Sequence, residues 1–271
     1  MTHSRLILAP PDRRQAVLDI MGSARRSLLF SVFRCDDFGV LEAVAAAVRR
    51  NVAVKIIVTS RAHGWKKRLD EVSALLEGAG AEVYRYPHPM KYHAKYIIAD
   101  DGSALIGTFN LTLECFQSTR DFLVVTHDPD VISGLTTLFH VDSRTPGAPT
   151  PAITDQLIVG PAETRSRLTQ LLESATQSIR ILDHRLSDPR ILALLKRAAS
   201  SGIVVETLGS RTAGDLTPHG TLFLIDGRTA IIGSASLSAI SLDGRRELAI
   251  VVTKPDVVRK LNSFFDTLSL P

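Results

Sequence analysis

Short β-branched apolar runs alternate with helical patterns along the chain, and the same order occurs twice. In the first half a strand pattern, Ser27–Arg34, precedes a helical pattern and a second β-branched run. The second half repeats this order between Ser178 and Leu208. The six segments are 27–34, 40–50 and 52–59, then 178–185, 191–200 and 203–208. Strands that alternate with helices in this way predict α/β layers.

Two longer stretches, Tyr92–Thr112 and Pro218–Ser238, match each other without gaps at an offset of 126 positions. The pairs at this offset are His93 and His219, Asp100 and Asp226, Gly107 and Gly233, Arg120 and Arg246, and Asp121 and Glu247. Upstream the offset is 151, so the first half holds 25 additional residues, with a helix expected near 69–77 and a strand near 82–86. The pattern indicates a duplicated supersecondary unit.

A stretch rich in proline, Ser143–Pro151, separates the two copies and is typical of a linker. We therefore divide the chain into a first half over 1–142, a linker over 143–152 and a second half over 153–271. We expect each half to be a mixed β-sheet flanked by helices. The halves should pack as a pseudo-twofold pair, because each would otherwise leave an apolar sheet surface exposed.

The composition is that of an ordinary globular protein, with 45% hydrophobic and 22% charged residues among 271. Two cysteines, Cys35 and Cys115, do not make a disulfide framework and favour a reducing compartment. The first residues do not resemble a signal peptide, and no apolar run reaches the roughly 18 residues of a membrane span. We therefore expect a cytoplasmic protein. The net charge of +4 fits an anionic substrate, and it fits an ordinary basic surface equally well.

The better preserved copy carries four polar residues at the ends of two neighbouring predicted strands. A strand over 92–99 would place His93 and Lys95 on the same side, because alternate residues of a strand share a face. The next strand runs into a glycine turn that leads to Thr108 and Asn110. One imidazole, one cation and neutral donors at a single spot would suit a phosphate group.

This arrangement is similar to the signature of the phospholipase D superfamily, whose members carry two copies of it in one chain or through a homodimer. The matching residues are His93, Lys95 and Asp100, followed by Gly107, Thr108 and Asn110. Through the repeat the resemblance covers nearly the whole chain. It implies two phospholipase D-like halves and a phosphodiesterase that needs no metal and no cofactor.

The resemblance also implies a two-step mechanism. His93 would attack phosphorus and form a phosphohistidine, and His219 would protonate the leaving oxygen and then activate water or an alcohol. Asp121 and Glu247 would orient the imidazoles. The remaining assignments are phosphate contacts from Lys95, Thr108 and Asn110, and scaffold positions at Asp100 and Asp226.

The second copy departs from the signature, since Thr221 replaces the lysine and Ser236 the asparagine. A hydroxyl donates to phosphate but carries no charge, and the lost contact is worth about 1.5–3 kcal/mol. The rate would fall about ten- to a hundredfold if no other cation substitutes. Thr221, Ser234 and Ser236 are the expected phosphate donors of this half, with His219 and Glu247 still present.

Three functions remain open. The first is a phosphodiesterase acting on nucleic acid, and the second is a phospholipase or a cardiolipin-synthase-like phosphatidyltransferase acting on a phospholipid headgroup. The third is a catalytically weak or inactive module that binds a phosphate ligand. Because both motif copies lie in one chain, a monomer would suffice, and a homodimer is possible but not required.

Two further features are expected near the cleft. The basic segment Arg61–Arg68 surrounds Trp65, and it would be either a phosphate-gripping loop or a solvated helix start. His184 and Arg185 occupy the positions that correspond to Phe33 and Arg34, so they are candidates to face the cleft.

Overall fold

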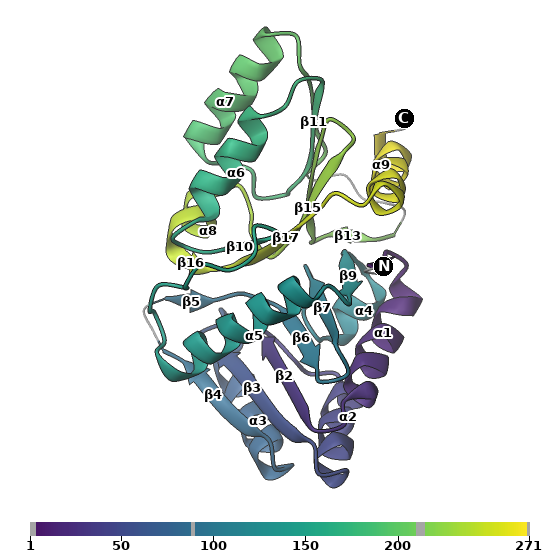
Figure 1. Ribbon diagram of the computed structural model, residues 1–271, viewed down its shortest axis with the longest axis vertical. Coiled ribbons are helices and arrows are strands. Elements are labelled where there is room, and N and C mark those ends of the chain that lie inside the picture. Colours follow the sequence, from purple (N-terminus) through teal and green to yellow (C-terminus); the bar gives the residue numbers. More distant parts are fainter. Residues whose placement is uncertain (1–3, 88–89, 210–214, 270–271) are drawn as a thin grey trace.

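The computed structural model describes residues 4–87, 90–209 and 215–269, which form two stacked halves (Figure 1). The strands of the first sheet lie in the order β1 (Arg5–Ile7), β9 (Leu123–Thr126), β7 (Ser103–Gly107), β6 (Tyr96–Ala99), β2 (Ser27–Val32), β3 (Ala53–Thr59) and β4 (Glu82–Tyr86). Those of the second lie in the order β10 (Leu157–Val159), β17 (Leu248–Val252), β15 (Thr229–Gly233), β14 (Thr221–Ile225), β11 (Ser178–Leu182) and β12 (Val204–Thr207). Both sheets mix parallel and antiparallel pairs.

The two strand orders agree position by position, which confirms the predicted α/β pair of related halves. Only β4, at the edge of the first sheet, lacks a counterpart among the described residues. It follows α3 (Lys66–Gly78), and both elements lie in the 25 additional residues of the first half.

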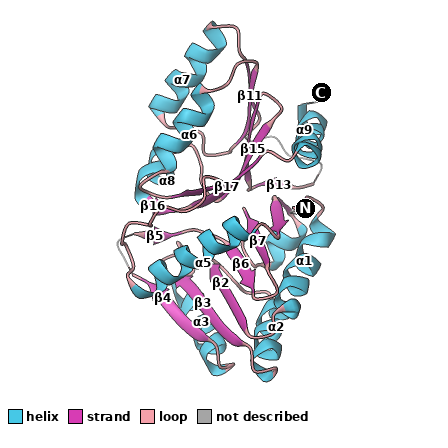
Figure 2. Ribbon diagram, viewed as in Figure 1, coloured by secondary structure: helices cyan, strands magenta, loops and turns pink. Residues whose placement is uncertain are grey.

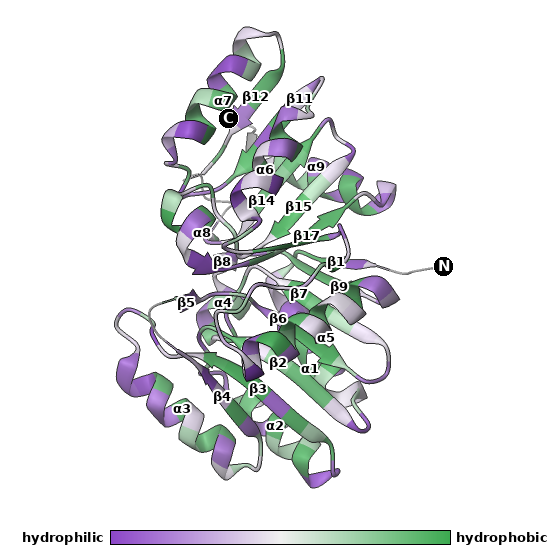
Figure 3. Ribbon diagram, turned by 60° about the vertical axis from the view of Figure 1, so that its left-hand side comes forward, coloured by the Kyte–Doolittle hydropathy of each residue, from purple (hydrophilic) through white to green (hydrophobic). Residues whose placement is uncertain are grey.

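Helices cover both faces of each sheet. Those of the first half are α1 (Pro10–Ser23), α2 (Phe38–Arg49), α3, α4 (Leu113–Gln117) and α5 (Pro129–Arg144), and those of the second are α6 (Thr164–Glu173), α7 (Pro189–Ser200), α8 (Ala239–Gly244) and α9 (Pro255–Ser269). Figure 2 shows α5 on the side of the first sheet that is turned toward the second half. Figure 3 shows hydrophobic residues concentrated in the strands and polar residues on the outer helices α3, α6 and α7.

One apolar core joins the halves. Val124 of β9 and Leu135 of α5 belong to the same buried cluster as Leu248 of β17 and Leu261 of α9. Separate clusters lie under α1 and α2 and under α6 and α7. The halves therefore share one hydrophobic core, as expected for a single bilobal unit. Among the described residues, no helix has both the length and the apolar character to cross a membrane.

A repeated ion pair fixes the start of one helix in each half. Asp37 caps α2 and lies 2.9 Å from Arg14, and Asp188 caps α7 and lies 2.8 Å from Arg165. Both pairs obey the 151-residue offset, so the duplication reaches further upstream than the sequence pattern indicated. An aspartate at this position satisfies backbone N–H groups of the first helical turn.

Two short parallel ladders cross from one half to the other. β5 (Lys91–Tyr92) pairs with β16 (Arg245–Arg246), and β8 (Thr119–Arg120) pairs with β13 (Thr217–Pro218). The ladders are related by the 126-residue offset. Each therefore holds the segment that carries one motif histidine against the segment that carries the other half's motif carboxylate.

The strand predicted over 92–99 is interrupted at 93–95, which corrects the sequence-based expectation. There the backbone N–H groups of His93 and Ala94 donate to the carbonyl oxygen of Arg246, at 2.8 and 2.9 Å. These N–H groups pair with the other half and not with a neighbouring strand of their own sheet. A pattern of alternating residues does not reveal such a partner.

The junction between the halves is ordered by a buried ion pair. Arg246 lies 2.5 Å from Asp142 at the end of α5, and it also donates to the carbonyl oxygen of Gly160 at 3.1 Å. Both side chains of the pair are almost fully buried. Helix α5 includes residues 143–144, the first two residues of the predicted linker.

Candidate active site

His93 and Glu247 come from different halves and form a buried couple. His93 Nδ1 lies 2.8 Å from Glu247 Oε2, and Ser241 donates to Glu247 Oε1 at 2.7 Å. The edge of the His93 ring meets Phe33, with the ring centroids 4.6 Å apart. These contacts fix the orientation of the imidazole.

His219 and Asp121 form the matching couple. His219 Nδ1 lies 2.8 Å from Asp121 Oδ1, and Thr108 and Thr119 both donate to the same carboxylate. The residue after the histidine, Gly220, runs so close to this cluster that a Cβ atom would lie 2.5 Å from Thr108 Oγ1. Glycine is therefore required there, whereas the first copy carries alanine at the corresponding position.

The couples are crossed, since each imidazole meets the carboxylate of the opposite half. An ionised carboxylate can only accept a hydrogen bond, so Nδ1 of each ring must carry a proton. Nε2 is then the reactive nitrogen of each ring. His93 and His219 line one small cavity together with Arg185, Ser234 and Ser236.

Electrostatics favour a neutral His93 beside an ionised carboxylate. Burial lowers the pKa of His93 to about 3, although Glu247 opposes the shift. Burial alone would raise the pKa of Glu247, but His93, and then the charge of Lys95, outweigh that effect and lower it to about 2. The pKa of Asp121 falls to about 2 in the same way, because His219 and the two threonine donors outweigh burial. At neutral pH, His93 is therefore uncharged.

Lys95 and Asn110 supply polar groups on the first-half side. Lys95 is buried, and its Nζ donates to the carbonyl oxygen of His93 at 2.8 Å. Burial lowers the pKa of this lysine to about 7, against the opposing charge of Glu247. Asn110 borders the same cleft as both histidines, and among the described residues its side-chain oxygen has no hydrogen-bond partner.

The hydroxyl groups of the second half are more strongly tied to the fold. Thr221 Oγ1 lies 2.8 and 2.9 Å from two backbone carbonyl oxygens. Ser234 exchanges hydrogen bonds with the backbone of Leu248, and Ser236 shares one with Ser238 at 3.0 Å. All three expected phosphate donors line the cavity, but the proton of Thr221 is directed into the backbone.

Asp100 and Asp226 lie at the far ends of their strands, away from the histidines. Asp100 accepts from the backbone N–H groups of Arg25 and Arg26 at 2.7 and 3.0 Å. Asp226 accepts from the backbone of residues 176–178 at distances between 2.7 and 3.1 Å. These bonds tie each motif hairpin to the strand beside it.

A wider cleft opens above the cavity and gathers positive charge. Arg34, Lys91, Arg185 and Arg245 border it together with both histidines. His184 also borders it and accepts a hydrogen bond from Arg185 at 3.1 Å, so the pair expected to face the cleft does so.

The basic segment Arg61–Arg68 lies beside this cleft. Arg61, His63 and Lys66 border its extension, and Lys66 is also the first residue of α3. Trp65 is contacted by two guanidinium groups, those of Arg34 and Arg68, each 5.1 Å from its ring. Of these two arginines Arg34 borders the cleft, so the tryptophan holds one guanidinium there through a cation–π contact.

Four residues around the site were missed from the sequence. Thr119 and Ser241 each donate to one of the two carboxylates, and Lys91 and Arg245 precede His93 and Glu247 by two positions. The repeat does not single these residues out, since the first copy has Cys115 where the second has Ser241. The only signal in the sequence was that they lie a few positions from the motif residues. Without the crossing ladders, nothing brings these positions together.

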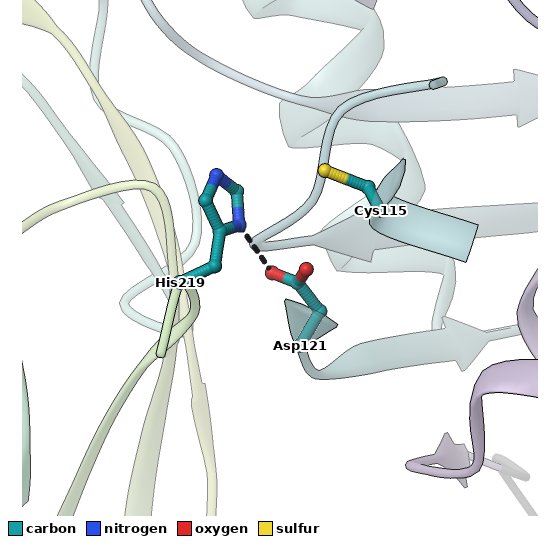
Figure 4. A group of neighbouring side chains, drawn as sticks. All are labelled: Cys115, Asp121 and His219. Carbon is teal, nitrogen blue, oxygen red and sulfur yellow. Dashed lines mark hydrogen bonds and ion pairs between the residues drawn. The ribbon is translucent and has the colours of Figure 1, made fainter. Parts of the chain in front are cut away.

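One group of side chains has the donor types of a metal site. Atoms of Cys115, Asp121 and His219 all lie within 4.8 Å of one another (Figure 4). Burial raises the pKa of the Cys115 thiol, and the Asp121 charge adds to that effect. His219 Nδ1 already shares a hydrogen bond with Asp121, so an ion bound by these atoms would replace that bond.

Solved structures share this bilobal fold over nearly the whole chain. Polyphosphate kinase from Porphyromonas gingivalis superposes with a TM-score of 0.80, covering 97% of this chain and 46% of that one at 17% identity. Phosphatidylserine synthase from Haemophilus influenzae Rd KW20 superposes with a TM-score of 0.79, covering 98% and 85% at 10% identity. At these identities the likeness establishes a common fold that extends over both halves.

Sequence comparison relates the first half to a known family. Residues 17–142 match the family described as cardiolipin synthase, PLD-like domain. Cardiolipin synthase A of Buchnera aphidicola subsp. Acyrthosiphon pisum is 31% identical over 121 residues, 43% of this chain and 24% of that protein. The match thus spans about a quarter of the length of the curated relative. Residues 17–142 therefore carry a phospholipase D-like domain, in agreement with the family that the motif predicted.

Proposed function

We propose that this protein cleaves or transfers phosphodiesters through a phosphohistidine intermediate. The crossed pair of imidazole–carboxylate couples carries the proposal, because it directs two Nε2 atoms, one from each half, toward one cavity. The low pKa of His93 supports this histidine as the nucleophile, since only a neutral imidazole can attack phosphorus.

In the first step His93 Nε2 forms a bond to phosphorus while the bond from phosphorus to the leaving oxygen breaks. His219 gives its Nε2 proton to that oxygen, so the leaving group departs as an alcohol. In the second step water or an alcohol attacks the phosphohistidine and gives its proton to His219, and the bond from His93 to phosphorus breaks. Asp121 and Glu247 hold the two rings and stabilise positive charge on them.

Arg185 is the proposed replacement for the missing second lysine. It borders the cavity between the histidines as well as the wider cleft. The described hydrogen bond of its side chain goes to His184, not to a carboxylate, so the guanidinium charge is available to a phosphate oxygen. Lys95 and Asn110 would hold the phosphate from the first half.

The proposed substrate is a phospholipid. The support comes from the printed names of similar proteins, cardiolipin synthase A and phosphatidylserine synthase. A phosphatidyl group held on His93 would pass to an alcohol in a transferase or to water in a phospholipase. The cytoplasmic location expected from the sequence remains a prediction.

Nucleic acid is a second candidate because the cleft is cationic along its length. The groups beyond Lys91 and Arg245 include His63 and Lys66, which suits an extended polyanion. The sign of the charge does not distinguish a nucleic acid from an anionic lipid surface, so the substrate assay must.

The test compares the unaltered protein with the variant His93→Gln, using bis-p-nitrophenyl phosphate as substrate in the presence of a chelator. We expect the unaltered protein to release nitrophenol and the variant to release none. Parallel assays with phospholipid vesicles and with single-stranded DNA separate the two substrates, and we expect turnover of the vesicles. If nothing is turned over while a phosphate ligand binds tightly, the protein is a binding module and the proposed chemistry is wrong.

A further inference from the structure

Two cations from opposite halves face each other at the mouth of the cleft. Lys91 and Arg245 are register partners in the β5–β16 ladder, and both border the cleft that contains the two histidines. Like charges placed opposite each other in a ladder are destabilising. Two cations that share only the distant carboxylate of Glu247 therefore leave a local excess of positive charge.

The surroundings neutralise this pair only in part. Arg245 Nη1 lies 3.9 Å from Glu247, beyond hydrogen-bond distance, and that carboxylate already accepts from His93 and Ser241. Two buried nitrogen atoms of Arg245, Nε and Nη1, have no hydrogen-bond partner among the described residues. Lys91 Nζ lies 4.6 Å from the centre of the Phe33 ring, a contact that uses none of its N–H donors.

Burial and the neighbouring arginines act on Lys91 in the same direction. Burial lowers the pKa of Lys91 to about 8, with Arg245, Arg185 and Arg34 adding to the shift and only Glu247 opposing it. An anion bound here would reverse these effects, because it would pair with both cations at once.

The pseudo-symmetry shows that this arrangement is not a requirement of the fold. At the related positions of the β8–β13 ladder the register partners are Thr119 and Thr217. This pair of register partners carries no charge, although the ladder also contains Arg120 opposite Pro218. The cationic pair is therefore an addition on the side of His93.

We propose that Lys91 and Arg245 form a second anion subsite, beside the cavity between the histidines, that holds a second phosphate group of the substrate. The inference rests on the proposed function in taking the anion to be part of the substrate. The ligand class is then a molecule with two phosphate groups, one reacting at His93 and the other bound by the cationic pair.

The same side of the cleft also extends further. Lys91 and Arg245 border a groove that continues to His63 and Lys66, at the start of α3. The segment that carries these two residues belongs to the additional material of the first half and has no counterpart among the described residues of the second. Extra polar surface and extra charge thus occur together, on the side where we place the second phosphate.

The test measures the binding of pyrophosphate and of orthophosphate to the full chain by calorimetry. We expect pyrophosphate to bind at least about tenfold more tightly, because only it can span both subsites. The variant Lys91→Gln/Arg245→Gln should lose about ten- to a hundredfold in pyrophosphate affinity and much less for orthophosphate. The control Lys196→Gln/Arg197→Gln removes the same charge from the exposed surface of α7 and should bind as the unaltered chain does.

Each outcome has a separate meaning. Equal affinity for the two anions, or a pyrophosphate affinity that is the same in the cleft variant and the control, would overturn the subsite. Two orthophosphate ions per chain, one of them lost in the cleft variant, would retain the anion site but assign it to a separate phosphate ion. If the pyrophosphate preference persists while phosphodiesters are not turned over, the subsite stands and the proposed chemistry fails.

Discussion

The two motif copies use the same backbone for different purposes. In the first, Lys95 is buried beside His93 and brings a positive charge with a lowered pKa. In the second, Thr221 occupies the corresponding position and bonds only to backbone carbonyl oxygens. The fold is therefore satisfied by a hydroxyl donor at this position, which leaves the lysine charge for the phosphate contact that we propose.

The difference extends to the arginines that follow β2 and β11. Arg34 is held against the Phe33 and Trp65 rings, whereas Arg185 is exposed in the cleft and reaches the cavity. The half that lost its lysine thus has the more accessible arginine. The comparison suggests unequal tasks for the two halves, and substitutions in each copy test that view.

The largest effect is expected at His93. The variant His93→Gln should reduce turnover of bis-p-nitrophenyl phosphate by about ten thousandfold or more, because no covalent intermediate can form. The variant His127→Gln is the control, since this histidine lies on an exposed loop. Comparable rates for the two variants would refute the assignment of His93 as nucleophile.

The two histidines should also fail in different ways. In His219→Gln the attack by His93 remains, so an activated substrate should leave a phosphohistidine that can be detected by intact mass after a short reaction. The same adduct in His93→Gln, and not in His219→Gln, would reverse the roles of the two copies.

A similarly large effect on stability is expected at the junction of the halves. Arg246→Met leaves Asp142 buried without its partner and should lower the free energy of unfolding by about 3–5 kcal/mol. Arg246→Met/Asp142→Leu should recover most of this loss. For comparison, Arg167→Met removes a pair with the exposed Asp155 and should cost less than about 1 kcal/mol. Urea unfolding measures the free energy of unfolding of all three variants. If Arg246→Met loses no more stability than Arg167→Met, the buried ion pair does not stabilise the junction of the halves.

Much of the fold could be predicted because duplication repeats a local pattern. The strand expected over 82–86 is β4 to the residue, and the missing counterpart in the second half follows from the change of offset. The break of the strand at 93–95 could not be predicted, since the N–H groups there pair with a distant carbonyl of Arg246.

The site was predictable in its residue types but not in its pairing. The motif singled out both histidines and both carboxylates, yet only the crossing ladders determine that His93 meets Glu247 and His219 meets Asp121. The hydrogen bond from the Thr221 hydroxyl to the carbonyl oxygen of Gly233 is likewise a contact that the sequence does not show. The type of a residue defines the chemistry that it can perform, and long-range contacts determine which partner it meets.

Among the cleft cations, Arg185 should matter most. Arg185→Met should lower kcat for bis-p-nitrophenyl phosphate about ten- to a hundredfold, because it removes the charge proposed to replace the second lysine. Arg34→Met should have a smaller effect, since Lys95 already serves that half and Arg34 is stacked on aromatic rings. If Arg34→Met is the more damaging of the two, Arg185 does not compensate for Thr221.

The lysine present in only one copy predicts a pH dependence. In the ligand-free protein Lys95 has a pKa of about 7, so it loses its charge as the pH rises above that value. Because kcat/KM reports groups of the free enzyme, it should fall by up to about tenfold per pH unit on the alkaline side. Lys95→Arg keeps the charge and should move this limb to higher pH. A wild-type profile that is flat between pH 7 and 9 would mean that the charge of Lys95 is not needed.

The smallest effects are expected at the paired helix caps, which compare the halves outside the site. Asp37→Ala and Asp188→Ala each remove a cap and an arginine contact, and each should cost about 1–2 kcal/mol in urea unfolding. Asp188→Ala should cost more, because Arg165 is only 21% exposed whereas Arg14 is 45% exposed, and solvent weakens the latter pair. Arg165 retains Asp243 as a second partner, which limits the difference. A larger loss of stability in Asp37→Ala than in Asp188→Ala would show that burial of the arginine does not determine the strength of this repeated ion pair.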